Sequence, residues 1–179
     1  SRQMGKSAII VDCDLRLPAL ARLLGADDKK PGLLSVLEGT TAIEEAVFED
    51  PATGLDVLMT RNSERHGNVN AADVLSSHKF EELIKKLSSL YDLVILDTPP
   101  VLVVADARII SKLADAVVYV VRWDETPRGA VLEGLKELHS INAPIAGVVM
   151  TMVNEDRASR YADDGYSYYK GKYRDYYAT

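Results

Sequence analysis

The fold is decided by the stretch Ser7-Ala-Ile-Ile-Val-Asp12-Cys-Asp14-Leu-Arg16-Leu-Pro18. Its apolar run is typical of a strand that is buried on both faces of a parallel sheet, and two aspartates follow at the carboxyl end of that run. The stretch Leu93-Val-Ile-Leu-Asp97-Thr-Pro-Pro100 repeats this pattern. In open α/β sheets, ligands bind at the edge formed by the carboxyl ends of the strands. Two strands that each bring a carboxylate to this edge predict a site for a metal ion and the phosphates that it carries.

The composition is that of one globular domain. The 179 residues are 47% hydrophobic and 27% charged, which is enough to bury a core. The net charge of −6 disfavours nucleic acid as a partner, because such binding depends on neutralising phosphates. Cys13 is the only cysteine of the sequence, so we expect no internal disulfide and a reducing compartment. We read neither a membrane-spanning run nor a signal peptide in the sequence.

Apolar runs that alternate with amphipathic segments predict an α/β fold with a mostly parallel sheet flanked by helices. The clearest helix covers residues 78–90, where apolar residues recur at helical spacing. Another is expected to begin at Pro18, which suits a first helical position. A third is expected near Thr41, which has capping-box spacing to Glu44. The remaining expected helices are 33–38, 105–113 and one from 127, and the expected strands are 8–11, 55–59, 93–97, 116–121 and 144–150.

Gly5-Lys6-Ser7 matches the end of a phosphate-binding loop, G-x-x-x-x-G-K-[ST]. Such a loop follows a strand and opens a helix, so that the helix N–H groups face the phosphates. Here Lys6 and Ser7 run straight into the strand that begins at Ala8. The pattern therefore favours the interpretation that Gly5 ends a helix in the left-handed conformation over a phosphate loop.

The acidic strand ends have the residue types that phosphoryl transfer needs. Asp97 resembles the Walker B aspartate that holds Mg²⁺ in phosphate-loop NTPases. Asp12 and Asp14 would point the same way in a continuing strand, so one can join the metal shell while the other accepts a proton from an incoming hydroxyl. The alternative is that these aspartates only cap loops. Arg16 is expected to pair with a carboxylate or with a neighbouring subunit. Three neighbouring residues are candidates for binding the cofactor: Arg16, Thr98 and Pro99.

The chain divides into a core, residues 1–157, and a tail, residues 158–179, of different character. From Tyr161 onward the tail has no aliphatic residue larger than alanine, so it cannot build a core and is expected to be flexible. An aromatic recognition tail and a stacking platform for nucleic acid are alternatives, but a mobile segment with many phenol groups favours phosphorylation. The tyrosines expected to be phosphorylated are Tyr161, Tyr166, Tyr168, Tyr169, Tyr173, Tyr176 and Tyr177.

Together these residues resemble the bacterial tyrosine kinases of capsule and exopolysaccharide synthesis, whose deviant phosphate-loop ATPase fold is related to the MinD/ParA group. Residues 9–16 are similar to the Walker A′ motif and residues 94–100 to Walker B. The resemblance implies ATP as cofactor, Mg²⁺ held by Asp12 and Asp97, and activation of the tyrosine by Asp14. It also implies autophosphorylation of the tail, often between subunits of a homo-oligomeric ring. The implied partners are a membrane-anchored activator or fused polysaccharide co-polymerase domain and a cognate tyrosine phosphatase, at the cytoplasmic face of the bacterial plasma membrane.

Two departures from this family stand out. The family's first strand and Walker A loop have no counterpart in residues 1–179, whether through truncation, omitted residues or degeneration, so we expect these residues alone to bind ATP weakly or not at all. After the last expected strand, Met150-Thr151-Met152 stands where the family often has Asn near the region that binds the nucleotide base. The expected function is an ATP-dependent tyrosine autokinase that regulates exopolysaccharide export. The alternatives are an ATPase switch of the MinD/ParA kind without kinase activity and a non-catalytic adaptor.

Overall fold

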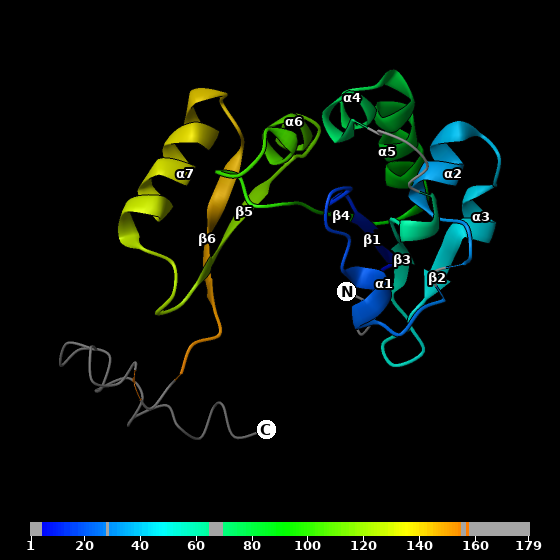
Figure 1. Cartoon of the computed structure of the whole chain (residues 1–179), viewed down its shortest axis with the longest axis horizontal. Helices are drawn as coiled ribbons and strands as arrows, with labels where there is room; N and C mark the ends of the chain where they lie inside the picture. Colours follow the sequence, from blue (N-terminus) through cyan, green and yellow to red (C-terminus); the bar gives the residue numbers. More distant parts are fainter. Residues whose placement is uncertain (1–4, 28, 65–69, 155–156, 158–179) are drawn as a thin grey trace.

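The computed structural model describes residues 5–27, 29–64, 70–154 and 157. The tail, residues 158–179, and its seven tyrosines lie outside the described residues. Figure 1 shows the first three strands and their helices on one side of the molecule, and the last two strands with the last helix on the other.

A four-stranded sheet in the order β2-β3-β1-β4 forms around the stretch that opens the chain. Strand β1 (Ala8–Asp12) pairs in parallel with β3 (Asp56–Leu58) and with β4 (Leu93–Asp97). Strand β2 (Val47–Glu49) is antiparallel to β3. Ile9 and Val11 lie on one face of β1 and are fully buried, and on the other face Ala8 is 5% exposed and Ile10 is partly buried against a second cluster. The first apolar run is therefore a strand covered on both faces, as predicted.

A separate two-stranded parallel sheet is formed by β5 (Val117–Arg122) and β6 (Ile145–Thr151). In the described residues β5 does not pair with β4, and a cavity of about 900 Å³ lies between them. On β5, Val118 and Val120 are 55% and 60% exposed. The prediction of a buried strand here is therefore wrong, because the face of β5 that carries Val118 and Val120 is left uncovered by the described residues.

The longer helices lie where the sequence predicts them. Helix α5 (His78–Leu90) begins after Ser77, whose hydroxyl accepts a hydrogen bond from the Phe80 amide. Its predicted apolar face is buried except at its last residue, Leu90, which is 54% exposed. Helices α6 (Asp106–Ser111) and α7 (Arg128–Ser140) match the other expected segments. The main core cluster contains residues from β1, β3, α5 and α6 and from three shorter helices, 33–38, 43–46 and 71–75.

The short elements correct several predictions. Helix α1 (Leu20–Leu23) begins after Ala19, so Pro18 lies before the helix. Helix α3 (Ile43–Ala46) is preceded by Ala42 without a side-chain cap and leads directly into β2, so Thr41 and Glu44 form no capping box there. Strand β2 pairs with β3, and its residues Val47 and Phe48 pack against different core clusters. The other short elements are α2 (Leu33–Glu38), η2 (Asn62–Glu64) and α4 (Ala71–Leu75).

Two glycines of helix α7 are expected to respond oppositely to alanine. A Cβ at Gly134 would collide with the Tyr119 ring on β5 and approach Val101, so Gly134→Ala should destabilise the fold by about 1–3 kcal/mol. A Cβ at Gly129 would meet open space, so Gly129→Ala should stabilise by about 0.5–1 kcal/mol. Urea unfolding of both variants checks this, and equal effects would show that α7 does not pack on β5 through Gly134.

Candidate functional site

The two predicted acidic strand ends lie side by side. Asp12 and Asp97 are register partners at the ends of the parallel strands β1 and β4, whose backbones are about 4.8 Å apart in such a ladder. The next amide, that of Cys13, donates to the Asp97 carbonyl oxygen at 2.9 Å. The expectation that both carboxylates reach one edge of the sheet is confirmed.

Asp12 is fully buried yet incompletely satisfied. Its Oδ1 accepts a hydrogen bond from the Asp14 amide at 3.2 Å, whereas its Oδ2 has no hydrogen-bond partner among the described residues. Burial, with added repulsion from the Asp97 and Asp14 charges, raises the pKa of Asp12 to about 6, although the backbone amides of Asp14 and Leu20 act in the opposite direction. A buried carboxylate oxygen without a partner is costly, and a bound cation would supply the missing partner.

Asp97 shares this electrostatic environment. Asp97 is more exposed to solvent than Asp12, but partial desolvation first, and the Asp14 charge second, raise the pKa of Asp97, while a hydrogen bond from the Thr98 amide acts in the opposite direction. The described residues contain no group of three or more His, Cys, Asp or Glu side chains placed to hold a metal ion. The pair nevertheless fits Mg²⁺, which commonly binds one or two carboxylates and completes its shell with water and substrate phosphates.

Asp14 lies beyond the end of β1, so the strand does not continue through it. Its Oδ1 accepts hydrogen bonds from the Arg16 amide at 3.2 Å and the Leu17 amide at 2.9 Å. One oxygen of the Asp14 carboxylate therefore caps the loop, as the alternative interpretation of the sequence expects. The nearness of Asp14 to Asp12 and Asp97, which raises the pKa of both, keeps it in the site.

Arg16 pairs with a carboxylate that the sequence analysis missed. Its Nε and Nη2 donate to the two oxygens of Asp106 at 2.7 and 3.1 Å. Asp106 is fully buried in the first turn of α6. The available signal was an acidic residue directly after an apolar run, at the start of the expected helix 105–113.

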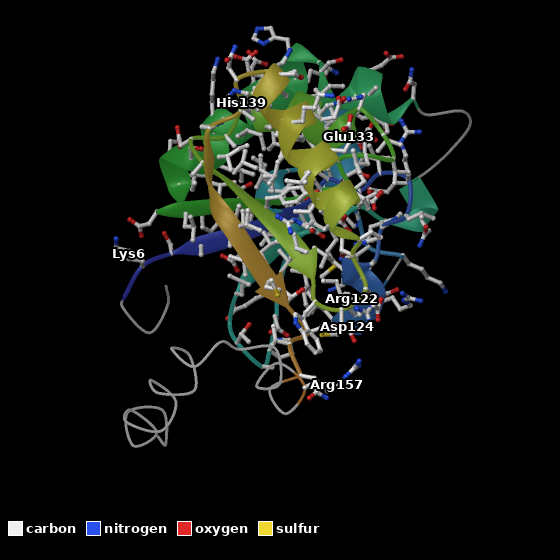
Figure 2. All side chains as sticks on the ribbon, turned by 90° about the vertical axis from the view of Figure 1, so that its left-hand side faces the viewer. Lys6, Arg122, Asp124, Glu133, His139 and Arg157 are labelled. Carbon is white, nitrogen blue, oxygen red and sulfur yellow. The ribbon has the colours of Figure 1, made fainter. Side chains whose placement is uncertain are left out.

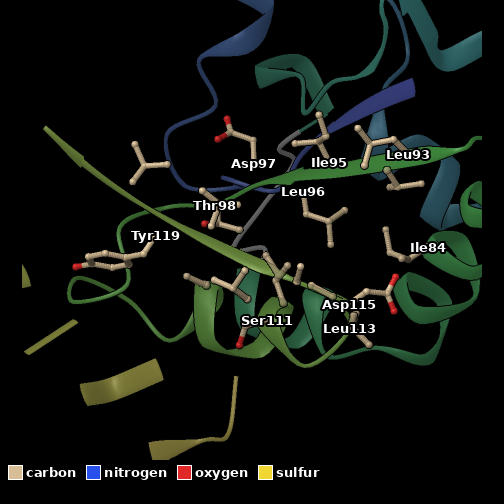
Figure 3. Close-up of a pocket in the computed structure, with 18 of the residues that line it drawn as sticks. Ile84, Leu93, Ile95, Leu96, Asp97, Thr98, Ser111, Leu113, Asp115 and Tyr119 are labelled. Carbon is tan, nitrogen blue, oxygen red and sulfur yellow. The ribbon is translucent and has the colours of Figure 1, made fainter. Parts of the chain in front are cut away.

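Thr98 and Pro99 line the cavity between β4 and β5 together with Asp97. Figure 3 shows Asp97 and Thr98 at the end of β4 beside this cavity. Thr98 is exposed and Pro99 is buried. Their part in binding the nucleotide stays a prediction.

The amino end of β1 is not a phosphate loop. Gly5 has a φ of +72°, the left-handed conformation that was predicted, and Lys6 and Ser7 lead directly into β1. The Ser7 amide and hydroxyl both donate to Asp92 Oδ2, at 2.8 and 3.0 Å, just before β4 begins. These residues therefore lie at the opposite end of β1 from Asp12.

The last described residue is held at the end of β5. Arg157 forms an ion pair with Asp124 at 2.7 Å and lies over the Trp123 ring, 5.6 Å from its centroid. Figure 2 shows Arg157 close to Asp124 beyond the end of the strand. Residue 157, which precedes the tail in the sequence, therefore lies where β5 and β6 end.

Comparisons with known proteins agree with this geometry. The AAA domain family matches residues 2–146. Tyrosine-protein kinase YwqD of Bacillus subtilis is 32% identical over 166 residues, 92% of this chain and 66% of the relative. Succinoglycan biosynthesis transport protein ExoP of Rhizobium meliloti is 28% identical over 174 residues, 97% of this chain and 22% of the relative. The chain thus spans between about a fifth and two thirds of the length of these relatives.

Among solved structures, the VpsO kinase domain superposes with a TM-score of 0.76 at 32% identity, covering 84% of this chain and 72% of that one. MinD of Aquifex aeolicus, in complex with MinC, shares the fold alone, with a TM-score of 0.69 at 19% identity. The chain belongs to the AAA domain family. Within that family it is a member of the bacterial tyrosine kinases, the group that the sequence motifs resemble.

Proposed function

We propose that the complete protein is an ATP-dependent tyrosine autokinase in which Asp12 and Asp97 hold Mg²⁺. The observation that carries this proposal is the buried Asp12 Oδ2 atom, which lacks a partner among the described residues beside the register partner Asp97. When bound, Mg²⁺·ATP would supply an electrophilic γ-phosphorus, and the metal would neutralise the negative charge of the phosphate oxygens. The residues of this chain would bind the metal ion and accept the proton that the tyrosine hydroxyl loses.

Asp14 is the proposed proton acceptor. As a tail tyrosine oxygen bonds to the γ-phosphorus, its O–H proton passes to the Asp14 carboxylate, and the bond from phosphorus to the β,γ-bridging oxygen breaks to release ADP. The hydrogen bonds from the Arg16 and Leu17 amides to Asp14 Oδ1 support this role, because they fix the direction of the carboxylate.

The open cavity supports a site that is completed by a further strand. Strands β4 and β5 face each other across about 900 Å³, and β4 also exposes apolar side chains, with Leu93 at 46% and Ile95 at 42%. A parallel strand placed there would bring its carboxyl end next to Asp97. A phosphate loop at that end would provide the lysine and the hydroxyl that grip ATP, beside Thr98 and Pro99.

The cellular setting is proposed from the relatives. ExoP is named as a succinoglycan biosynthesis transport protein, so we propose that this protein regulates exopolysaccharide synthesis and export at the inner face of the plasma membrane. Its proposed partners are a membrane-anchored activator or fused co-polymerase domain, other copies in a ring, and a tyrosine phosphatase. In the described part of the chain, none of the helices has the length and apolar character of a membrane span.

The direct test is to incubate the complete protein with ATP and Mg²⁺ and to locate phosphotyrosine by mass spectrometry. We expect phosphotyrosine within residues 161–177. A single Tyr→Phe change there should alter total phosphorylation little, because neighbouring tyrosines substitute, whereas replacing all seven should remove it. Bound ATP without tail phosphotyrosine would contradict the proposal.

The shared fold with MinD makes an ATPase switch the second candidate function. Its signature would be ATP hydrolysis that is unchanged when residues 161–179 are removed, with no phosphotyrosine formed. An adaptor would show neither hydrolysis nor autophosphorylation, and its tail would be modified only when another kinase is added.

A further inference from the structure

A second buried carboxylate lies outside the acidic pair. The side chain of Asp106 is fully buried, and both of its oxygens accept hydrogen bonds from the Arg16 guanidinium, which is 45% exposed. Carboxylates are rarely buried without such a partner, and the two-point geometry is the strong and directional form of this pair. The pair therefore fixes where Arg16 lies relative to helix α6.

Backbone hydrogen bonds connect Arg16 to the acidic site. Its own amide donates to Asp14 Oδ1, and the Asp14 amide donates to Asp12 Oδ1. These bonds orient the Asp12 carboxylate, whose Oδ2 keeps no partner among the described residues. The turn after β1 is thus fixed at one end by the strand and at the other by Asp106.

Helix α6, which carries Asp106, packs against the core and follows the end of β4 in the chain. Ala107 and Ile110, on the same helix as Asp106, are 8% and 2% exposed. Residues 98–105 join Asp97 to Asp106 directly. One ion pair therefore ties together the two segments that follow the two acidic strand ends.

We propose that Arg16 and Asp106 are positioning residues that set the Mg²⁺ affinity of the Asp12–Asp97 pair. This inference rests on the proposed metal site, and it assigns the Arg16 guanidinium to Asp106 and not to the nucleotide. Residues that orient metal-binding side chains typically change metal affinity by about 10–100-fold when they are replaced. Arg16→Lys keeps the positive charge but loses the two-point hydrogen bonding of the guanidinium. Asp106→Asn keeps the shape of the side chain but loses its negative charge.

The experiment titrates Mg²⁺ into the complete protein carrying Arg16→Lys, Asp106→Asn or both. Two midpoints are read: Mg²⁺-dependent thermal stabilisation without ATP, and tail phosphorylation with saturating ATP. Each single variant should raise both midpoints about tenfold, and the double variant should raise them no further because the two residues act as one unit. The matched control is Arg108→Lys. Arg108 lies on the same helix as Asp106 but pairs with Glu137 of α7, so this variant should leave both midpoints unchanged.

Unchanged Mg²⁺ midpoints with a raised ATP requirement in Arg16→Lys would overturn the inference. Arg16 would then be assigned to binding the nucleotide. Additive effects in the double variant would also overturn it. If Asp106→Asn does not fold, Arg16→Lys decides alone, because its side chain lies at the surface. The thermal readout needs no phosphorylation, so it tests this inference even if the kinase proposal fails.

Discussion

Replacing Asp12 by asparagine is expected to stabilise the metal-free fold at neutral pH while abolishing Mg²⁺-dependent phosphorylation. Burial raises the pKa of Asp12 to about 6, so the folded chain binds this proton more tightly than the unfolded chain does. The free energy of unfolding therefore falls as the pH rises from about 4 to about 6. Asparagine removes this cost, so the gain should be on the order of 2–3 kcal/mol at pH 7.5 and near zero at pH 4.

Urea unfolding without Mg²⁺, at a series of pH values, measures this gain. Asp50→Asn is the control of opposite sign, because hydrogen bonds from Thr53 and Ala52 lower the pKa of Asp50. Its stabilising contribution is present above the ordinary carboxyl pKa and is lost on acidification, so this variant should be less stable than the parent at neutral pH. A loss of stability in Asp12→Asn at pH 7.5 would show that the buried carboxylate is satisfied in the free protein.

Replacing Asp97 by alanine is expected to lower Mg²⁺-dependent tail phosphorylation in the complete protein by at least about 100-fold. A metal ion contributes several kcal/mol of charge stabilisation to such a transition state, and each 1.4 kcal/mol or so is a factor of ten. The fold should persist, because the Asp97 side chain is exposed. Initial rates of phosphotyrosine formation at saturating ATP measure the effect.

Asp92→Ala is the matched control for Asp97→Ala. Asp92 lies just before the same strand but at its amino end, where it accepts hydrogen bonds from Ser7. This variant should phosphorylate its tail at nearly the parental rate. Full activity in Asp97→Ala would refute the Walker B assignment.

The strands that position the site were predictable because their signal is local. An apolar run that ends in an acidic residue specifies the point where the strand ends, and this held for β1 and β4. The expected burial held for β1 only, because Leu93 and Ile95 of β4 face the open cavity and are 46% and 42% exposed. Helix α5 was equally clear, since its apolar residues recur at helical spacing over more than three turns. These local patterns were sufficient to place Asp12 and Asp97 at one edge.

The features that the sequence analysis missed depend on contacts between distant residues. Arg16 and Asp106 are 90 residues apart, and the local sequence around either residue does not predict that the two pair. Strand β2 is three residues long and exists because β3 pairs with it. The separation of β4 from β5 is likewise a matter of which strands pair, which an apolar pattern does not specify.

The most direct measurement is a crystal structure of the complete protein with ADP and Mn²⁺, in which anomalous scattering locates the ion. We expect one manganese peak at the carboxyl ends of β1 and β4, bound to Asp12 and Asp97 directly or through water. A peak that contacts neither carboxylate, or clear nucleotide density with no ion between them, would contradict this expectation.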